Sequence, residues 1–155
     1  MGDPILAMRI RDGLAALEYL RTRPEIDPRK IVIGGYGMGG IVALHLALID
    51  GTVAGVFSWD GLATFESLAT AERYAWSHED FFPFVLKYYD LPELAAQVAM
   101  PGLLANPLGP GKEALDFLSV KSLYAKAMKK TESFKIETGK NSRQAILSFI
   151  NRLIY

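Results

Sequence analysis

The sequence contains no cysteine and only two histidines, His45 and His78. The lack of cysteine excludes disulfides, thiol nucleophiles and zinc sites built on cysteine, and two histidines exclude most histidine metal sites. We therefore expect neither a metal nor a cofactor. The 17 basic residues balance the 17 acidic residues, so the formal net charge is zero. A balanced charge argues against nucleic acid as a partner, because nucleic acid is usually met by a basic face.

Long hydrophobic runs are also missing. No stretch of 18 apolar residues occurs, and the first residues carry no basic segment followed by an apolar export signal. These absences predict a cytoplasmic protein without membrane contact. Half of the 155 residues are hydrophobic and 22% are charged, which is the balance of a globular chain. The length predicts a single domain over residues 1–155.

Short apolar runs alternate with helical patterns along the chain. The predicted strands are 31–33, 53–59, 102–106 and 133–137, and the predicted helices are 4–21, 41–49, 94–100, 113–130 and 142–153. The aromatic stretch 63–92 predicts helical pieces that are broken at Pro83 and Pro92. Strands separated by helices of this size imply parallel βαβ units with right-handed crossovers. The predicted fold class is α/β, a three-layer αβα sandwich around a four-stranded parallel sheet.

A glycine cluster at 34–40 lies between a predicted buried strand and a predicted apolar helix. Such a turn places backbone N–H groups at the carboxyl end of a sheet, where ligands bind. One interpretation is dinucleotide binding, because Gly35, Gly37 and Gly40 satisfy G-x-G-x-x-G. Asp60 follows 20 residues after Gly40, at the spacing of an acidic residue that binds a ribose hydroxyl.

The other interpretation is a nucleophile elbow, the sharp strand-to-helix turn that carries a catalytic serine. The segment Gly35-Tyr36-Gly37-Met38-Gly39 reads G-x-S-x-G with glycine in place of serine. The strained turn crowds its neighbours, so small residues are needed two places before and after the nucleophile. Gly35 and Gly39 supply these small residues.

At this motif the chain resembles the α/β-hydrolase fold family, in which Gly-Tyr-Ser-Met-Gly-Gly is a common form of the elbow. The segments 26–31 and 50–56 look like the approaches to the family's fifth and sixth strands. The segment 99–107 looks like the seventh strand, especially that of the acetyl-xylan-esterase-like and dienelactone-hydrolase-like branches. The resemblance implies the C-terminal half of the family's sheet, strands five to eight, with a cap-like insertion at about 63–92.

The resemblance also implies where the catalytic groups would lie. Acyl transfer in this family needs a nucleophile, a base, an acid and an oxyanion hole. Gly37 stands at the nucleophile's position, and the backbone N–H of Met38 would be one oxyanion donor. The family's histidine belongs at 138–141 and its acid at 107–111, but the first segment contains no histidine and the second contains no carboxylate. Asp60 could replace the acid.

The two histidines have structural interpretations. His45 is expected to pack within the helix layer, and His78 to lie in a solvated turn. The predicted function is therefore a truncated, inactive carboxyl-ester-hydrolase-like domain. The alternatives are a binding or scaffolding module that holds an ester or sugar-like ligand with Tyr36, Trp76 and Tyr88, or a dinucleotide-binding domain.

The first predicted strand also raises the question of a partner. An uncovered apolar parallel strand is a liability, because its unpaired backbone groups invite other chains. We therefore expect the edge Ile31–Gly35 to be covered by a second copy of the chain or by a separate N-terminal half.

Overall fold

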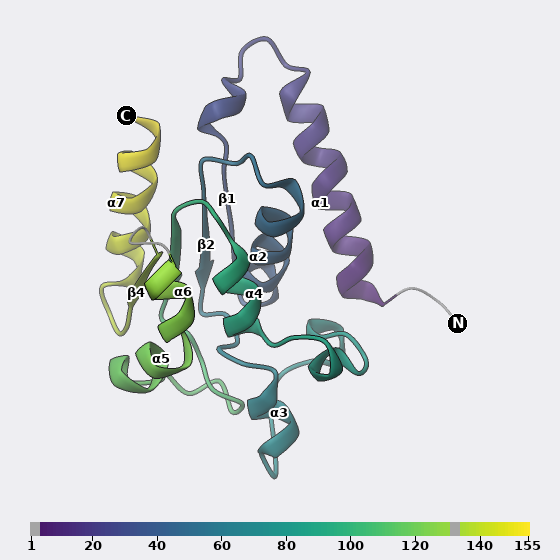
Figure 1. Cartoon of the computed structure of the whole chain (residues 1–155), viewed down its shortest axis with the longest axis vertical. Coiled ribbons are helices and arrows are strands. Elements are labelled where there is room, and N and C mark those ends of the chain that lie inside the picture. Colours follow the sequence, from purple (N-terminus) through teal and green to yellow (C-terminus); the bar gives the residue numbers. More distant parts are fainter. Residues whose placement is uncertain (1–3, 131–133) are drawn as a thin grey trace.

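The structure is a computed structural model that describes residues 4–130 and 134–155 (Figure 1). Its centre is a parallel sheet with strand order β1-β2-β3-β4. The strands are β1 (Val32–Tyr36), β2 (Gly55–Trp59), β3 (Gly102–Ala105) and β4 (Phe134–Glu137). The predicted α/β class and the four-stranded parallel sheet are confirmed.

Helices connect the strands and cover both faces of the sheet. They are α1 (Ile5–Arg21), α2 (Met38–Asp50), α3 (Glu66–Thr70), α4 (Leu91–Gln97), α5 (Phe117–Leu123), α6 (Ala125–Lys130) and α7 (Ser142–Ile154). Three short 3-10 turns are η1 (Pro28–Lys30), η2 (His78–Asp80) and η3 (Val85–Lys87). Of the helices that the structure describes, none is long and apolar enough to cross a membrane.

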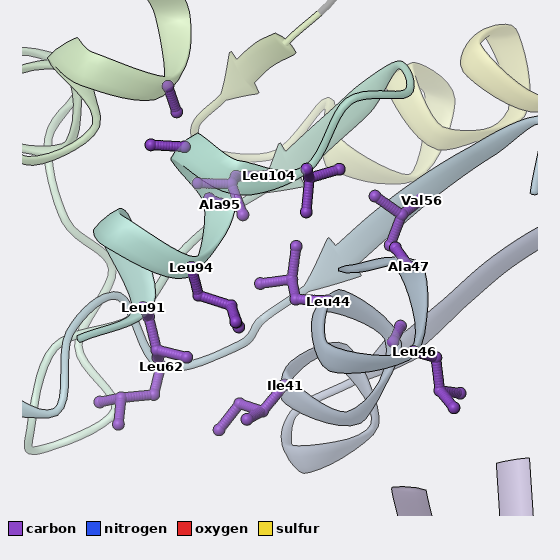
Figure 2. Packing of buried hydrophobic residues seen from close by; sticks show 14 of the residues in the cluster. Ile41, Leu44, Leu46, Ala47, Val56, Leu62, Leu91, Leu94, Ala95 and Leu104 are labelled. Carbon is purple, nitrogen blue, oxygen red and sulfur yellow. The ribbon is translucent and has the colours of Figure 1, made fainter. Parts of the chain in front are cut away.

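The core has two parts, one on each face of the sheet. Leu104 of β3 belongs to the larger cluster, where it packs with side chains of α2 and α4 such as Leu44 and Leu94 (Figure 2). Its neighbours Leu103 and Ala105 belong to a second cluster, with side chains of α7. Successive strand residues point to opposite faces, so α2 and α4 lie on one face and α7 on the other. This arrangement is the predicted three-layer sandwich.

The prediction of one helix over 113–130 is wrong, because the helix is interrupted at Tyr124, between α5 and α6. The side chain of Tyr124 is directed into the core, where its hydroxyl donates to the carbonyl oxygen of Ala63 at 2.7 Å. Its ring stacks on Phe134 of β4 with 6.2 Å between centroids. Burial raises the pKa of the Tyr124 phenol above its usual value. The helix begins late, at Phe117, because Asp116 caps it by accepting from the Ser119 N–H.

Pro92 was predicted to break a helix and instead lies in the first turn of α4. A proline is tolerated there because the first N–H groups of a helix have no intrahelical acceptor. Asp90 caps the helix by accepting from the N–H of Leu91 at 2.6 Å, and Glu93 accepts from the N–H of Asp90 at 2.7 Å. The helix predicted at 94–100 therefore begins and ends earlier.

Other boundaries differ by a few residues. The first strand continues through two glycines to Tyr36 instead of ending at Ile33, and the following helix begins at Met38 rather than Ile41. The prediction that this strand is buried is wrong: its residues are half-buried or exposed, because it lies at the edge of the sheet. The last strand was predicted from Ser133, which lies outside the described residues. Pro4 precedes the first helical residue instead of being it.

Strand β1 forms one edge of the sheet within the described residues. Its odd-numbered residues face β2, since the Ile31 carbonyl accepts from Ala54 and the Gly37 N–H donates to Trp59. Alternation along the strand therefore directs the backbone groups of Val32 and Gly34 away from the sheet. An apolar groove of about 420 Å³ follows this edge between α1 and α2. The predicted partner strand is not tested by a single chain and stays a prediction, against which a stable monomer in sedimentation would count.

Candidate functional site

The turn between β1 and α2 has the geometry of an elbow. Gly37 has φ 56° and ψ −121°, a backbone conformation that residues with a side chain rarely adopt. Its N–H donates to the carbonyl of Trp59 at 2.8 Å, and its carbonyl accepts from the N–H of Gly40 at 3.1 Å. The bond to Trp59 holds the turn at the end of the neighbouring strand β2, and the bond from Gly40 closes the turn itself. A Cβ added at Gly37 would meet no atom within 4 Å, so the turn opens into free space.

Crowding at the elbow affects one of the two flanking glycines. A Cβ at Gly35 would lie 2.2 Å from the carbonyl carbon of Gly39, a backbone contact that no side-chain rotation relieves. The prediction that residue 35 must be small is confirmed. At Gly39 the same prediction is wrong, because a Cβ there would meet nothing within 4 Å. The strand and the helix approach each other at Gly35, and the Gly39 side of the crossing is open.

A hollow of about 220 Å³ lies over the elbow at the carboxyl end of the sheet. Its lining residues are Tyr36, Gly37, Met38, Asp60, Trp76, Asp80, Leu108 and Lys112. Five residues predicted for the site therefore meet here. The segment 63–92, predicted as a cap-like insertion, reaches the hollow and holds α3, η2 and η3 beyond the ends of the strands (Figure 1).

Trp76 forms a fixed wall of the hollow. Its side chain is 6% exposed, and its Nε1 donates to the carbonyl oxygen of Gly109 at 2.9 Å. The Nζ of Lys112 lies 5.2 Å from the centroid of the Trp76 ring, within the range of a cation–π contact. Burial and the hydrogen bond hold the ring in place at the hollow.

Asp60 is bound to a neighbouring loop. Its Oδ1 accepts from the Nδ2 of Asn106 at 2.7 Å, and the Oδ1 of Asn106 accepts from the Gly139 N–H at 3.4 Å. Asp60 and Asn106 both have positive φ, 49° and 52°, a conformation that short polar side chains tolerate. The three residues follow β2, β3 and β4. They connect the carboxyl ends of these strands, and the carboxylate of Asp60 holds the side-chain amide of Asn106.

Sequence reasoning missed Asp80 and Lys112 as parts of the site. Asp80 is buried, and its Oδ2 accepts from the N–H of Ser77 at 2.8 Å. Ser77 and Asp80 form a capping box around η2, and the S-x-x-D spacing of this motif was readable from the sequence. Nothing in the sequence brings Lys112 to Trp76, because this contact depends on how the loop after β3 folds back.

Neither histidine lies at the hollow. His45 is 6% exposed within α2; its Nδ1–H donates to the Ile41 carbonyl at 2.8 Å, and its Nε2 accepts from the Tyr89 hydroxyl at 2.7 Å. A carbonyl can only accept, so the proton of the neutral ring is on Nδ1. Burial lowers the pKa of His45, and the bond to Ile41 opposes this effect. His78 is exposed in η2, beside the rings of Tyr74 and Phe81. The packing interpretation of His45 and the solvated-turn interpretation of His78 agree with these positions.

Of the predicted binding residues Tyr36 and Tyr88, only Tyr36 lies at the hollow over the elbow. Tyr36 lines the hollow, and its ring meets Trp59 edge-on with 5.5 Å between centroids. Tyr88 is 83% exposed and lines a different hollow, together with His45 and Glu93. The structure therefore does not bring Tyr88 to the elbow. In the described chain no three histidine, aspartate or glutamate side chains are grouped so that they could hold a metal ion.

Comparison with known proteins agrees with this geometry. Residues 1–76, which include the elbow and Asp60, match the model of the dienelactone hydrolase family. A solved structure named m3DLH matches 96% of this chain with a TM-score of 0.59 and 14% sequence identity. The chain is dienelactone-hydrolase-like. The match spans 62% of the length of m3DLH, so this dienelactone-hydrolase-like chain corresponds to part of that protein.

Proposed function

We propose that this dienelactone-hydrolase-like domain does not hydrolyse esters and instead binds a small ester or a related ligand over the elbow. The observation that carries the proposal is Gly37. It has the backbone conformation of an elbow, but it has no side chain to attack a carbonyl carbon. Nucleophilic acyl transfer requires a hydroxyl or thiol at this position, activated by a neighbouring base.

The surroundings of Gly37 support the loss of the reaction. The side chain of Asp60 is hydrogen-bonded to Asn106, so it does not orient an imidazole. His45 is held within the helix layer by Ile41 and Tyr89. A base must come within hydrogen-bond reach of its nucleophile, and neither histidine lines the hollow.

The part of the machinery that remains is suited to binding. Met38 is the first residue of α2, and the first N–H groups of a helix lack intrahelical acceptors. The Met38 N–H would donate to the carbonyl oxygen of a ligand, as an oxyanion-hole donor does. Trp76 supplies an apolar wall and Lys112 a positive charge.

Ester hydrolysis by the unmodified chain and by Gly37→Ser tests the proposal. With p-nitrophenyl acetate, both proteins should release nitrophenol no faster than Gly37→Ala, because a serine without a base is a weak nucleophile. Gly37→Ala is the matched control, since it has the same backbone constraint and no hydroxyl. Inhibitor-sensitive turnover by the unmodified chain would refute the loss of activity.

Binding is tested with the unreactive amide analogue p-nitroacetanilide. Trp76→Phe should weaken its binding because the smaller ring leaves part of the wall missing. Tyr88→Phe is the control, because Tyr88 lies outside the hollow. Equal binding by all three proteins would reject the hollow as the binding site.

A dinucleotide site is the competing candidate. In the doubly wound dinucleotide fold the strand order reverses at the first strand, whereas here the order runs β1-β2-β3-β4 without reversal. A ligand at about 100 times its dissociation constant stabilises a protein by about 2.7 kcal/mol, which is visible as a higher melting temperature. We expect no such shift with millimolar nicotinamide or flavin cofactors. A clear shift would favour the dinucleotide interpretation.

A further inference from the structure

A separate hollow lies in the segment between β2 and β3, and its lining shares no residue with the hollow over the elbow. It is a cleft of about 280 Å³ among α3, η3 and the loops around them. Five of its ten lining residues are aromatic: Phe65, Tyr74, Phe81, Phe82 and Phe84. None of the ten is charged. The walls therefore suit an apolar group, and aromatic rings favour offset or edge-on contact with another ring.

The size of the cleft limits what it can hold. An apolar cavity of roughly 150 Å³ is large enough to bind benzene. The cleft has nearly twice this volume, which suits two fused rings better than one.

Phe84 stands at the cleft in an unusual conformation. Its backbone has φ 62° and ψ 17°, the left-handed region, and its side chain is 74% exposed. A bulky residue at positive φ is an energetically costly outlier that persists only where the surrounding structure fixes it. An exposed aromatic ring buries little apolar surface, so it does not offset the cost of the strained backbone. Both features are expected of a residue that contacts a ligand.

A positive charge accompanies this ring. The Nζ of Lys87 lies 4.9 Å from the centroid of Phe84, within the range of a cation–π contact. A ligand in the cleft that contacts the Phe84 ring therefore lies near an ammonium group. The apolar lining and the neighbouring cation together select an apolar body with an anionic head.

We propose that this cleft binds an amphiphilic anion of the size of a naphthalene carboxylate or sulfonate. The ring system lies between the aromatic walls, and the anionic group faces Lys87. The proposal is independent of what binds over the elbow, because the two linings are separate.

The test is a fluorescence titration of the full chain with 1-anilinonaphthalene-8-sulfonate, compared with the neutral dye N-phenyl-1-naphthylamine. The anionic dye should bind at one site and be displaced by naphthalene-2-carboxylate. Phe84→Ala should weaken both dyes, by about tenfold for the apolar contact that is lost. Lys87→Gln should weaken the anionic dye alone, by about two- to fivefold, as expected for one exposed ion pair.

The chain contains a matched control for these two variants. Lys121 lies over the ring of Phe117 at 5.8 Å, so the same pair of residue types occurs away from the cleft. Phe117→Ala and Lys121→Gln should leave the binding of both dyes unchanged. Near-UV circular dichroism of each variant shows whether the native packing is retained, since partly folded chains also bind such dyes.

Three results would overturn the proposal. The first is binding of the anionic dye to Phe84→Ala as tight as to the unmodified chain. The second is equal weakening of both dyes by Lys87→Gln. The third is preference for the neutral dye, which would point to an apolar side chain of a protein partner as the occupant. Gly37→Ala should leave dye binding unchanged, which separates this site from the elbow.

Discussion

Alanine substitutions at three neighbouring glycines should have three different effects on stability. At Gly37 the added methyl group meets no atom, but the residue must remain at φ 56° and ψ −121°. The strain of such a conformation is on the order of 1–3 kcal/mol. Gly37→Ala should therefore fold with a moderately reduced free energy of unfolding.

At Gly35 the problem is space. The added Cβ would lie 2.2 Å from the carbonyl carbon and 2.4 Å from the carbonyl oxygen of Gly39. Overpacking costs typically about 1–3 kcal/mol when side chains can move. Here the contact is with backbone, so either β1 or α2 must shift, and we expect a loss of at least about 3 kcal/mol. A domain has only about 5–15 kcal/mol in total, so this variant should be close to unfolding.

Gly39→Ala is the control of the series. It lies in the first turn of α2, where a Cβ meets nothing within 4 Å. Alanine in a helix is favoured over glycine by roughly 0.5–1 kcal/mol, so this variant should be unchanged or slightly more stable.

Urea unfolding followed by the fluorescence of Trp59 and Trp76 measures the series. With a slope of about 2 kcal/mol per molar urea, each loss of 2 kcal/mol lowers the midpoint by about 1 M. The expected order of stability is Gly39→Ala first, then Gly37→Ala, then Gly35→Ala. If Gly35→Ala were as stable as Gly37→Ala, the close crossing of strand and helix would be refuted.

Two further predictions concern buried polar groups. Burial lowers the pKa of His45, so between the unfolded value of about 6.5 and the lower folded value only the unfolded chain binds this proton. The stability that this group contributes is present above pH 6.5 and is lost as the pH falls, by at most about 1.4 kcal/mol per pH unit. Urea midpoints measured from pH 7.5 to 5.5 should therefore decrease with falling pH. His45→Gln should reduce this dependence of the midpoint on pH. Tyr124→Phe removes the donor to the buried Ala63 carbonyl and should cost about 1–3 kcal/mol. The exposed Tyr155→Phe is its control, and equal urea midpoints for the two variants would contradict the role of this hydrogen bond.

Local sequence determined the framework of the domain. The β-branched run at 31–33 and the glycine cluster after it predicted a strand, a tight turn and a helix, because strand, turn and helix each depend on residues close in the chain. The burial predicted for this strand depends on its neighbours in the sheet, and its residues are half-buried or exposed. The elbow motif also indicated that Gly35, Gly37 and Met38 would lie at the carboxyl end of the sheet. The resemblance to the dienelactone hydrolase family lies in the same segment, since residues 1–76 match the model of that family.

Contacts between distant segments could not be read in this way. The helix predicted over 113–130 breaks at Tyr124 because the hydroxyl of this residue reaches Ala63, 61 positions earlier. Asp60 was a candidate acid by its position after a strand. Its partner Asn106 is 46 residues away, and this partner decides what the carboxylate does.

The sequence by itself therefore determined the fold class, the tight turn after the first strand and the glycine at position 37, since these depend on residue type and short spacing. Only the tertiary structure decided which side chains share a hollow. It brought Trp76 and Lys112 to the elbow, placed Tyr88 elsewhere, and formed the aromatic cleft beside Lys87. The physical reason is that hydrogen bonds and packing between segments far apart in the chain set the loop conformations, and short-range spacing carries no record of these contacts.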